Sequence, residues 1–338
     1  MASNQTPNPI EISKHLVKWF KADERDLPWR KSKDPYLVWI SEIMLQQTTT
    51  QVVRGYFKRF TEKWPTVSAV SKASQEEVNE YWAGLGYYSR ARNILKAAQI
   101  VDSELNGVFP KTASELIKLP GIGPYTSRAI SSICFSEKVG VVDGNVLRVH
   151  NRLLGKKINW WEKTFFTSTQ EFSDSLCQIK PPNIINPALM DLGSTVCTPK
   201  KVMCSLCPLT KNCVTFKKGL QGELPLPKPR KEKEFWQYSV YKNSLGQRSL
   251  YAVNAEKINS PILKKNILPE GLFKKLNVKP KQYDFMHTIT NHNIFIKFVD
   301  HPQTGPKPQK IGKTRLKQET PSSMIEKIWQ HPNFYENI

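Results

Sequence analysis

The sequence predicts a mainly α-helical chain that ends in a small α+β domain, and three observations lead to this prediction. Its 338 residues, 39% of them hydrophobic, are enough for two or three domains with cores of their own. Up to about residue 218, helix start signals are followed by apolar residues at helical spacing. Beyond about residue 235 the pattern changes to short strand-like runs.

Two capping boxes mark helix starts in the first part. Ser74-Gln-Glu-Glu77 and Thr112-Ala-Ser-Glu115 each place a glutamate three residues after a hydroxyl side chain, so that the two side chains can satisfy backbone N–H groups reciprocally. We therefore expect a helical domain over residues 1–220. Helically spaced apolar residues follow the two boxes, namely Val78, Tyr81, Trp82 and Leu85 after the first and Leu116, Ile117 and Leu119 after the second.

Residues 221–234 concentrate proline and charge, which is typical of an extended linker. A small α+β domain is expected over residues 235–338, and the Pro/Lys-rich stretch 302–318 is expected to be a mobile basic loop. The strand-like runs of this domain are Phe235–Tyr241, Ser249–Val253 and Asn293–Val299.

The formal net charge of +21 produces a field that attracts polyanions, so nucleic acid is the expected partner. A generally basic protein without this partner is the alternative that charge alone leaves open. The amino terminus lacks the basic and apolar regions of a signal peptide, and no apolar run approaches the length of a spanning helix. We therefore expect a cytoplasmic protein that has no membrane partner and is associated with the nucleoid through DNA.

Four cysteines fall in one Cys-x6-Cys-x2-Cys-x5-Cys run: Cys197, Cys204, Cys207 and Cys213. Thiolates this close together can wrap a single metal centre. A zinc ribbon usually uses two Cys-x2-Cys knuckles, whereas this run contains only one. The asymmetric spacing favours an iron–sulfur cluster.

Two further segments carry polar chemistry. A helix is expected to begin within Leu119-Pro-Gly-Ile-Gly-Pro-Tyr-Thr126, where the two glycines leave backbone N–H groups free to bind a phosphate. Such a turn can also be purely structural. In Val141-Val-Asp-Gly-Asn-Val146 one carboxylate, Asp143, follows an apolar run. It can act as a catalytic acid group or cap the next helix.

Taken together and in this order, these segments resemble the endonuclease III superfamily of helix-hairpin-helix DNA glycosylases. The cysteine run after Asn186-Pro-Ala-Leu-Met-Asp-Leu-Gly193 is similar to the [4Fe–4S] loop of that superfamily. Three segments resemble its adenine glycosylase branch, the MutY type: Trp39-Ile-Ser-Glu-Ile-Met-Leu-Gln-Gln-Thr48, Gly84-Leu-Gly-Tyr-Tyr-Ser-Arg-Ala-Arg-Asn93 and Asp143-Gly-Asn145.

The resemblance implies a fold and a partner. Residues 30–135 would form a six-helix lobe with the helix-hairpin-helix, residues 1–29 and 136–220 an iron–sulfur lobe, and residues 235–338 a reduced MutT-like (Nudix-like) domain. The cofactor would be a [4Fe–4S] cluster on the four cysteines. The substrate would be double-stranded DNA with adenine opposite 8-oxoguanine or guanine, bound by a monomer.

The resemblance also implies roles for single residues. Glu42 would protonate adenine, Asp143 would stabilise the cationic sugar, and Asn145 would position this carboxylate or the DNA backbone. Lyase relatives carry a nucleophilic lysine where this chain has Tyr125, which implies a monofunctional enzyme. The residues expected to contact DNA are Arg25, Arg30, Gln46, Gln47, Thr48, Tyr87, Gly121 and Gly123 in the helical domain and Phe285, Met286 and His287 in the last domain.

The chain departs from the family pattern in two more places. Pro187 stands where the family commonly has a glutamine or glutamate facing adenine, and Met286 replaces the serine of a lesion-reading Phe-Ser-His. Two other functions therefore stay open at this point. One is an endonuclease III-like glycosylase/lyase for oxidised pyrimidines, and the other is a non-catalytic iron–sulfur protein that binds DNA.

Overall fold

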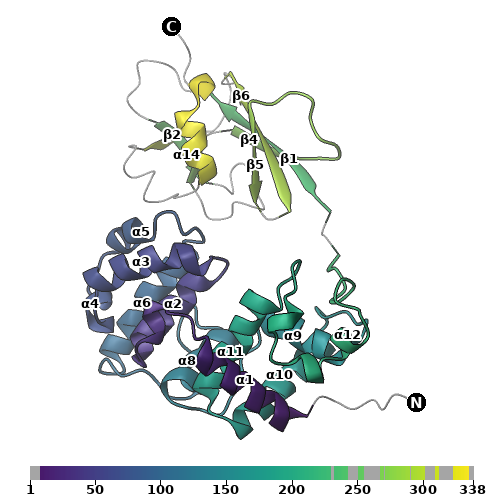
Figure 1. Ribbon diagram of the computed structural model, residues 1–338. Coiled ribbons are helices and arrows are strands. Elements are labelled where there is room, and N and C mark those ends of the chain that lie inside the picture. The colour runs from purple at the N-terminus through teal and green to yellow at the C-terminus, as the bar shows by residue number, and fades with distance from the viewer. Residues whose placement is uncertain are drawn as a thin grey trace. The chain divides into compact units, whose positions relative to one another are not determined.

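A computed structural model describes residues 8–229, 232–242, 250–254, 267–269, 271–289, 291–300, 309–311 and 323–334. The chain divides into two compact units, Met1–Lys228 and Pro229–Ile338. The first unit is helical and the second contains the strands (Figure 1). Among the described residues, none of the helices combines the length and the apolar character needed to cross a membrane.

The first unit is built from α-helices and four short helical turns. The turns are η1 (Pro28–Arg30), η2 (Leu192–Val196), η3 (Cys204–Leu206) and η4 (Thr210–Asn212). The α-helices are α1 (Pro9–Ala22), α2 (Pro35–Leu45), α3 (Thr50–Lys63), α4 (Val67–Ser71), α5 (Gln75–Trp82), α6 (Ser89–Ser103), α7 (Ala113–Leu116), α8 (Pro124–Cys134), α9 (Gly144–Leu154), α10 (Lys163–Ile179), α11 (Pro182–Asp191) and α12 (Val214–Lys217).

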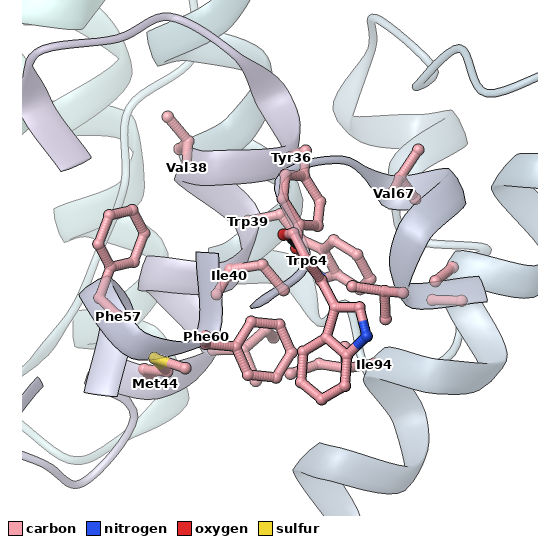
Figure 2. Packing of buried hydrophobic residues seen from close by; sticks show 14 of the residues in the cluster. Tyr36, Val38, Trp39, Ile40, Met44, Phe57, Phe60, Trp64, Val67 and Ile94 are labelled. Atoms are coloured by element: carbon pink, nitrogen blue, oxygen red, sulfur yellow. Dashed lines mark hydrogen bonds between the residues drawn. The ribbon is translucent and has the colours of Figure 1, made fainter. Parts of the chain in front are cut away.

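One hydrophobic core occupies the continuous stretch from Leu27 to Ile130, which we call the first lobe. Its central helix is α2, where every residue from 36 to 44 except Leu37 is buried, so that this helix has hardly any solvent-facing side. Figure 2 shows side chains of α2 such as Trp39 and Met44 packed with Phe57 and Phe60 of α3. A polar side chain on such a helix must therefore lie in the interior or face a cavity.

A second core joins the two ends of the unit and defines the second lobe. Ile12, Leu16 and Phe20 of α1 pack with apolar residues between Val142 and Leu209. Helix α1 contacts α10 and α11, although more than a hundred residues of chain separate them (Figure 1). The two lobes of the unit therefore have separate cores.

Of the two predicted capping boxes, one is confirmed and one is wrong. Ser74 and Glu77 make both reciprocal bonds at the start of α5. The Thr112 hydroxyl instead donates to the Glu115 carboxylate at 2.7 Å, and the free N–H of Ala113 donates to Glu137 at 2.8 Å. The carboxylate that caps α7 therefore comes from a residue far along the chain, which no local pattern reveals.

The predicted hairpin turn is confirmed as the connection between α7 and α8. Leu116, Leu119 and Ile122 are buried, as the pattern requires, while Ile117 is exposed. Gly121 has φ +78°, and a Cβ atom at this position would lie 2.6 Å from the side chain of Asn93. Glycine is needed there because both the backbone conformation and the close approach exclude a side chain.

The described residues of the second unit form two small sheets. The larger has the strand order β4-β1-β6-β5 and is mixed, because β1 (Glu234–Tyr241) and β6 (His292–Val299) are parallel and the other pairs antiparallel. Alternate side chains of both strands pack with α14 (Ser323–Gln330). The smaller antiparallel sheet has the order β3-β2-β7. The remaining elements are β2 (Leu250–Asn254), β3 (Ile267–Pro269), β4 (Gly271–Leu276), β5 (Phe285–Ile289), β7 (Gln309–Ile311) and η6 (Pro332–Phe334).

The three predicted strand-like runs coincide with β1, β2 and β6, except that Ser249 lies outside the described residues. The predicted basic loop needs a correction. Gln309–Ile311 forms the edge strand β7, and the rest of 302–318 lies outside the described residues. The chain leaves the helical unit at Lys228, inside the stretch expected to be a linker.

Candidate active site

A cavity of about 900 Å³ lies between the two lobes of the helical unit. Glu42 lines it from α2, Tyr125 from α8, and Asp143 and Asn145 from the start of α9. The structure thus brings Glu42 together with the other predicted catalytic residues, of which Asp143 lies about a hundred positions later in the sequence. A cavity of this size falls within the range of small-molecule sites.

Glu42 is buried because its helix is buried on nearly all sides, and only 7% of the residue is exposed. Burial raises the pKa of Glu42 to about 7, since the charged form loses hydration. A hydrogen bond from Tyr125 and the charge of Arg30 oppose this shift, whereas Asp143 adds to it. At pH 7 about half of the Glu42 carboxyl groups therefore carry the proton that a general acid donates.

Tyr125, at the start of α8, carries a neutral hydroxyl. Burial and the nearby carboxylates of Glu42 and Asp143 raise its pKa well above the ordinary value. The hydroxyl also lies 3.0 Å from the sulfur of Met190. It acts here as a fixed hydrogen-bond donor in the cavity wall.

Asp143 is both the N-cap of α9 and a wall of the cavity. One carboxylate oxygen accepts from the backbone N–H groups of Asn145 at 2.9 Å and Val146 at 2.8 Å. The other oxygen accepts from the Asn145 side-chain amide at 2.7 Å. The capping and catalytic interpretations of the sequence are therefore compatible, because the cap fixes the carboxylate in the cavity.

Asn145 is itself held by Arg148, one turn along α9. The guanidinium of Arg148 donates to the side-chain oxygen Oδ1 of Asn145 at 2.7 Å and to the backbone carbonyl of Gly193 at 2.6 Å. Gly193 approaches so closely that a Cβ atom would lie 2.5 Å from that of Asn145. Sequence reasoning missed Arg148, although its helical spacing from Asn145 is a signal that could have found it.

The two predicted arginines of the amino-terminal segment also line the cavity. Arg30 makes two bonds to the buried Asp191 carboxylate, at 2.6 and 2.9 Å, and Arg25 lies 3.4 Å from the same group. Arg25 also donates to the Thr50 hydroxyl at 2.8 Å. Their contact with DNA stays a prediction, and Asp191 as their partner was not foreseen.

Gln46, Gln47 and Thr48 follow the carboxyl end of α2 at the edge of the cavity. Gln47 is exposed and has φ +60°, a conformation that is unusual for a residue other than glycine. Tyr87 shares both properties, with 60% of its surface exposed and φ +50°. This exposure shows that Tyr87 is not an ordinary core aromatic. It does not line the cavity itself, nor do Gly121 and Gly123.

Cys197, Cys204, Cys207 and Cys213 line one shared cavity in the second lobe, together with Arg152. Arg152 donates to the Cys197 carbonyl at 3.2 Å and lies 3.3 Å from its sulfur. Within the described part of the chain, no three His, Cys, Asp or Glu side chains are grouped as a site for a single metal ion. The four thiols of the run nevertheless border the same space, which fits the donor set of a cluster.

Pro187 is buried within α11 and lines the catalytic cavity. It brings no side-chain hydrogen bond to this wall, and the polar groups of the same helix that line the cavity are Asn183 and Asp191.

In the second unit, the side chains of strand β5 alternate. Met286 is 42% exposed, whereas Phe285 and His287 are partly buried and lie on the opposite face of the strand. Phe285 stacks on His331, with ring centroids 5.4 Å apart. Burial lowers the pKa of His287, with a smaller contribution from Lys327. Met286 is thus the member of the tripeptide that is open to solvent.

Comparison with known proteins agrees with this fold. Residues 40–168 match the HhH-GPD superfamily base excision DNA repair protein family. The helical unit resembles the structure of a trapped endonuclease III–DNA covalent intermediate, with a TM-score of 0.53 and 26% identity over 64% of this chain and all of that chain. The family match and this likeness therefore define a helix-hairpin-helix protein of base excision repair.

Two curated relatives narrow this class. The adenine DNA glycosylase of Buchnera aphidicola (subspecies Baizongia pistaciae) is 33% identical over 291 residues, which are 85% of this chain and 72% of the relative. That of Rattus norvegicus is 42% identical over 222 residues, 62% of this chain and 43% of the relative, so the chain spans less than half of the rat protein. The chain belongs to the adenine DNA glycosylase family.

Proposed function

We propose that the protein is a monofunctional DNA glycosylase that removes adenine mispaired with 8-oxoguanine or guanine in double-stranded DNA. The observation that carries this proposal is the buried Glu42, whose pKa burial raises to about 7, in the same cavity as the ordered carboxylate of Asp143. The relatives named above, which are adenine DNA glycosylases, support the choice of base. The charge of +21 supports binding to a polyanion.

The proposed chemistry needs both carboxyl groups. Neutral adenine is a poor leaving group, so Glu42 donates a proton to a ring nitrogen as the glycosidic bond weakens. The bond breaks towards an oxocarbenium-like sugar, which the Asp143 carboxylate stabilises as a second carboxylate does in retaining glycoside hydrolysis. Asn145 keeps this carboxylate in place through its bond of 2.7 Å. Water then completes the hydrolysis.

Base release under single-turnover conditions, from duplexes with adenine opposite 8-oxoguanine, guanine or thymine, tests this proposal. Release from the first two, with strands that stay intact until alkali is added, is the expected result, because Tyr125 has no amine for a Schiff base. Efficient trapping of a covalent DNA adduct with borohydride would support a glycosylase/lyase instead. Binding without any base release would support a non-catalytic DNA-binding protein.

We propose further that Cys197, Cys204, Cys207 and Cys213 hold a [4Fe–4S] cluster. The shared cavity of the four thiols and the spacing of the run support this assignment. A bound cluster would link the loop that carries the four cysteines to the carboxyl-terminal part of the second lobe. This link would stabilise the loop. Its thiolate ligands would lie beside the Arg152 guanidinium, which already contacts Cys197.

Anaerobically purified protein is expected to be brown and to contain about four irons per chain with equivalent acid-labile sulfide. Cys204→Ser should lower the iron content and the yield of soluble protein, because one ligand of the proposed cluster is lost. Cys134→Ser, outside the run, is the matched control and should leave the iron content unchanged. Stoichiometric zinc without sulfide would contradict the assignment.

For the second unit we propose a reduced MutT-like domain that recognises the base opposite adenine. Its mixed sheet and the exposed position of Met286 on an edge strand support this role. A serine hydroxyl can accept the N7 proton that 8-oxoguanine carries and guanine lacks, whereas the methionine thioether is only a weak acceptor. We therefore expect this protein to prefer 8-oxoguanine over guanine by a smaller margin than a relative that carries Phe-Ser-His.

Met286→Ser is expected to widen that preference by about 1 kcal/mol, or roughly fivefold, as expected for one net hydrogen bond. The measurement is the ratio of single-turnover rates and affinities for the two duplexes. Leu272→Ser makes the same apolar-to-hydroxyl change on exposed strand β4, where 61% of Leu272 is accessible, and should leave the ratio unchanged. An unchanged ratio for Met286→Ser would show that this residue does not meet the lesion.

A further inference from the structure

Arg90 is a buried cation that neither the proposed chemistry nor the sequence patterns explain. Only 8% of the residue is exposed, and among the described residues no carboxylate forms an ion pair with it. Burial lowers its pKa accordingly. An unpaired buried charge is costly, so its other contacts must compensate for the lost hydration.

Those contacts join two segments of the chain. One terminal nitrogen of Arg90 donates to the carbonyls of Ile43 at 2.7 Å, Met44 at 3.2 Å and Gln46 at 2.8 Å. These carbonyls belong to the carboxyl end of α2, which carries partial negative charge and lacks intrahelical donors. Arg90 thus caps the helix that bears Glu42, immediately before the exposed Gln47.

The other terminal nitrogen of Arg90 donates to Leu85 at 2.9 Å and Gly86 at 3.2 Å. Its guanidinium also lies 5.6 Å from the ring centroid of Tyr87. This turn is strained at Tyr87, which has φ +50°, whereas Gly86 adopts its positive φ without a steric cost. Tyr56 supports the turn from the other side, where its hydroxyl donates to Ala83 at 2.8 Å.

We infer that Arg90 is a positioning residue that fixes Gln47 and Tyr87 relative to each other and to the helix of Glu42. The inference rests on the proposed function, because Gln47 and Tyr87 are among the residues expected to contact DNA, where exposed side chains of this kind would hold open the base stack after adenine leaves it. A planar guanidinium can donate at once to the carbonyls at the end of α2 and to those of the turn at Leu85 and Gly86. The ammonium of a lysine lacks this forked geometry, although it keeps the charge.

Arg90→Lys tests this inference, with Arg92→Lys as the matched control, since Arg92 is exposed on the same helix. Adenine release is measured in single turnover from a full duplex and from a duplex with an abasic site opposite adenine. The fluorescence of 2-aminopurine next to the target adenine reports unstacking in the same samples. The thermal midpoint of each variant shows whether the fold is retained.

We expect Arg90→Lys to slow release from the full duplex by on the order of tenfold to a hundredfold and to reduce the 2-aminopurine signal. The deficit should shrink opposite the abasic site, where less stacking and pairing must be broken. Arg92→Lys should match the wild type. Equal losses on both duplexes, or an unchanged signal, would overturn the inference.

Tyr56→Phe provides a second test of the same turn if Arg90→Lys does not fold. It removes only the hydroxyl bonded to Ala83 and should produce a smaller loss in the same direction. Wild-type behaviour of this variant on both duplexes would then overturn the inference. A wild-type chain that releases no adenine from any duplex would instead contradict the proposed function.

Discussion

Glu42→Gln is expected to slow single-turnover adenine release by on the order of 10³-fold, because general acid catalysis contributes about that much. The amide has nearly the size of the carboxyl group but cannot give up a proton to adenine. Binding to the duplex should be retained, since Glu42 is buried in the cavity and is not part of the exposed surface that would contact DNA. The measurement compares the release rates and duplex affinities of the wild type and Glu42→Gln on the same duplex.

The pH profile separates proton donation from other effects of this substitution. Glu42 has a pKa of about 7, raised by burial, so it is protonated below that pH and loses its proton as the pH rises. The wild-type rate should therefore fall about tenfold per pH unit above 7. Glu42→Gln should abolish this fall, because the amide does not titrate.

Glu24→Gln is the matched control for this experiment. Glu24 also lines the cavity, but it is exposed, and the substitution makes the same change from a carboxyl group to an amide. Its rate and pH profile should match those of the wild type. If both variants lose the same activity, the loss reflects any carboxyl-to-amide change in the cavity, and Glu42 is not the proton donor.

Asp143→Asn is expected to slow adenine release by about 10²- to 10³-fold while duplex binding persists, because electrostatic stabilisation of the cationic sugar is lost. Asparagine is as good an N-cap as aspartate, so α9 should still begin at residue 144. The substitution therefore removes the charge without removing the cap. Circular dichroism and the thermal midpoint check that the fold is unchanged.

Asp34→Asn is the corresponding control, because Asp34 caps α2 through a bond of 2.8 Å to the backbone N–H of Tyr36. It makes the same change of side chain at another helix start outside the cavity. Near-wild-type release by Asp34→Asn with loss by Asp143→Asn would identify the carboxylate as catalytic. Similar rates for both variants would show that Asp143 only caps its helix.

Local patterns predicted the parts of this structure that depend on neighbours in the sequence. The Ser74 cap, the hairpin before α8 and the strand-like runs of the second unit all follow from residues a few positions apart. The grouping of Glu42 with Asp143 was expected from family resemblance, since periodicity and spacing give no distance between residues a hundred positions apart. Their common cavity is a property of the folded lobes.

The interactions that sequence reasoning missed involve partners distant in the chain. Arg90 looks like one of several cations on a helix, and only the fold shows that it points inward to α2. Asp191 likewise gave no sign that it would pair with Arg30, 161 positions earlier. Charged residues are usually exposed, so a buried one is recognised only once its partners are known.

The division of the helical unit into two cores also bears on how the chain is synthesised. The first lobe is one continuous stretch, so it can fold as soon as its last residue, near Ile130, has left the ribosome. Helix α1 emerges earlier, yet its partners α10 and α11 are translated only afterwards. Helix α1 is therefore buried only after these later helices have been made, and its apolar face, with Ile12 and Leu16, lacks its packing partners while they are translated.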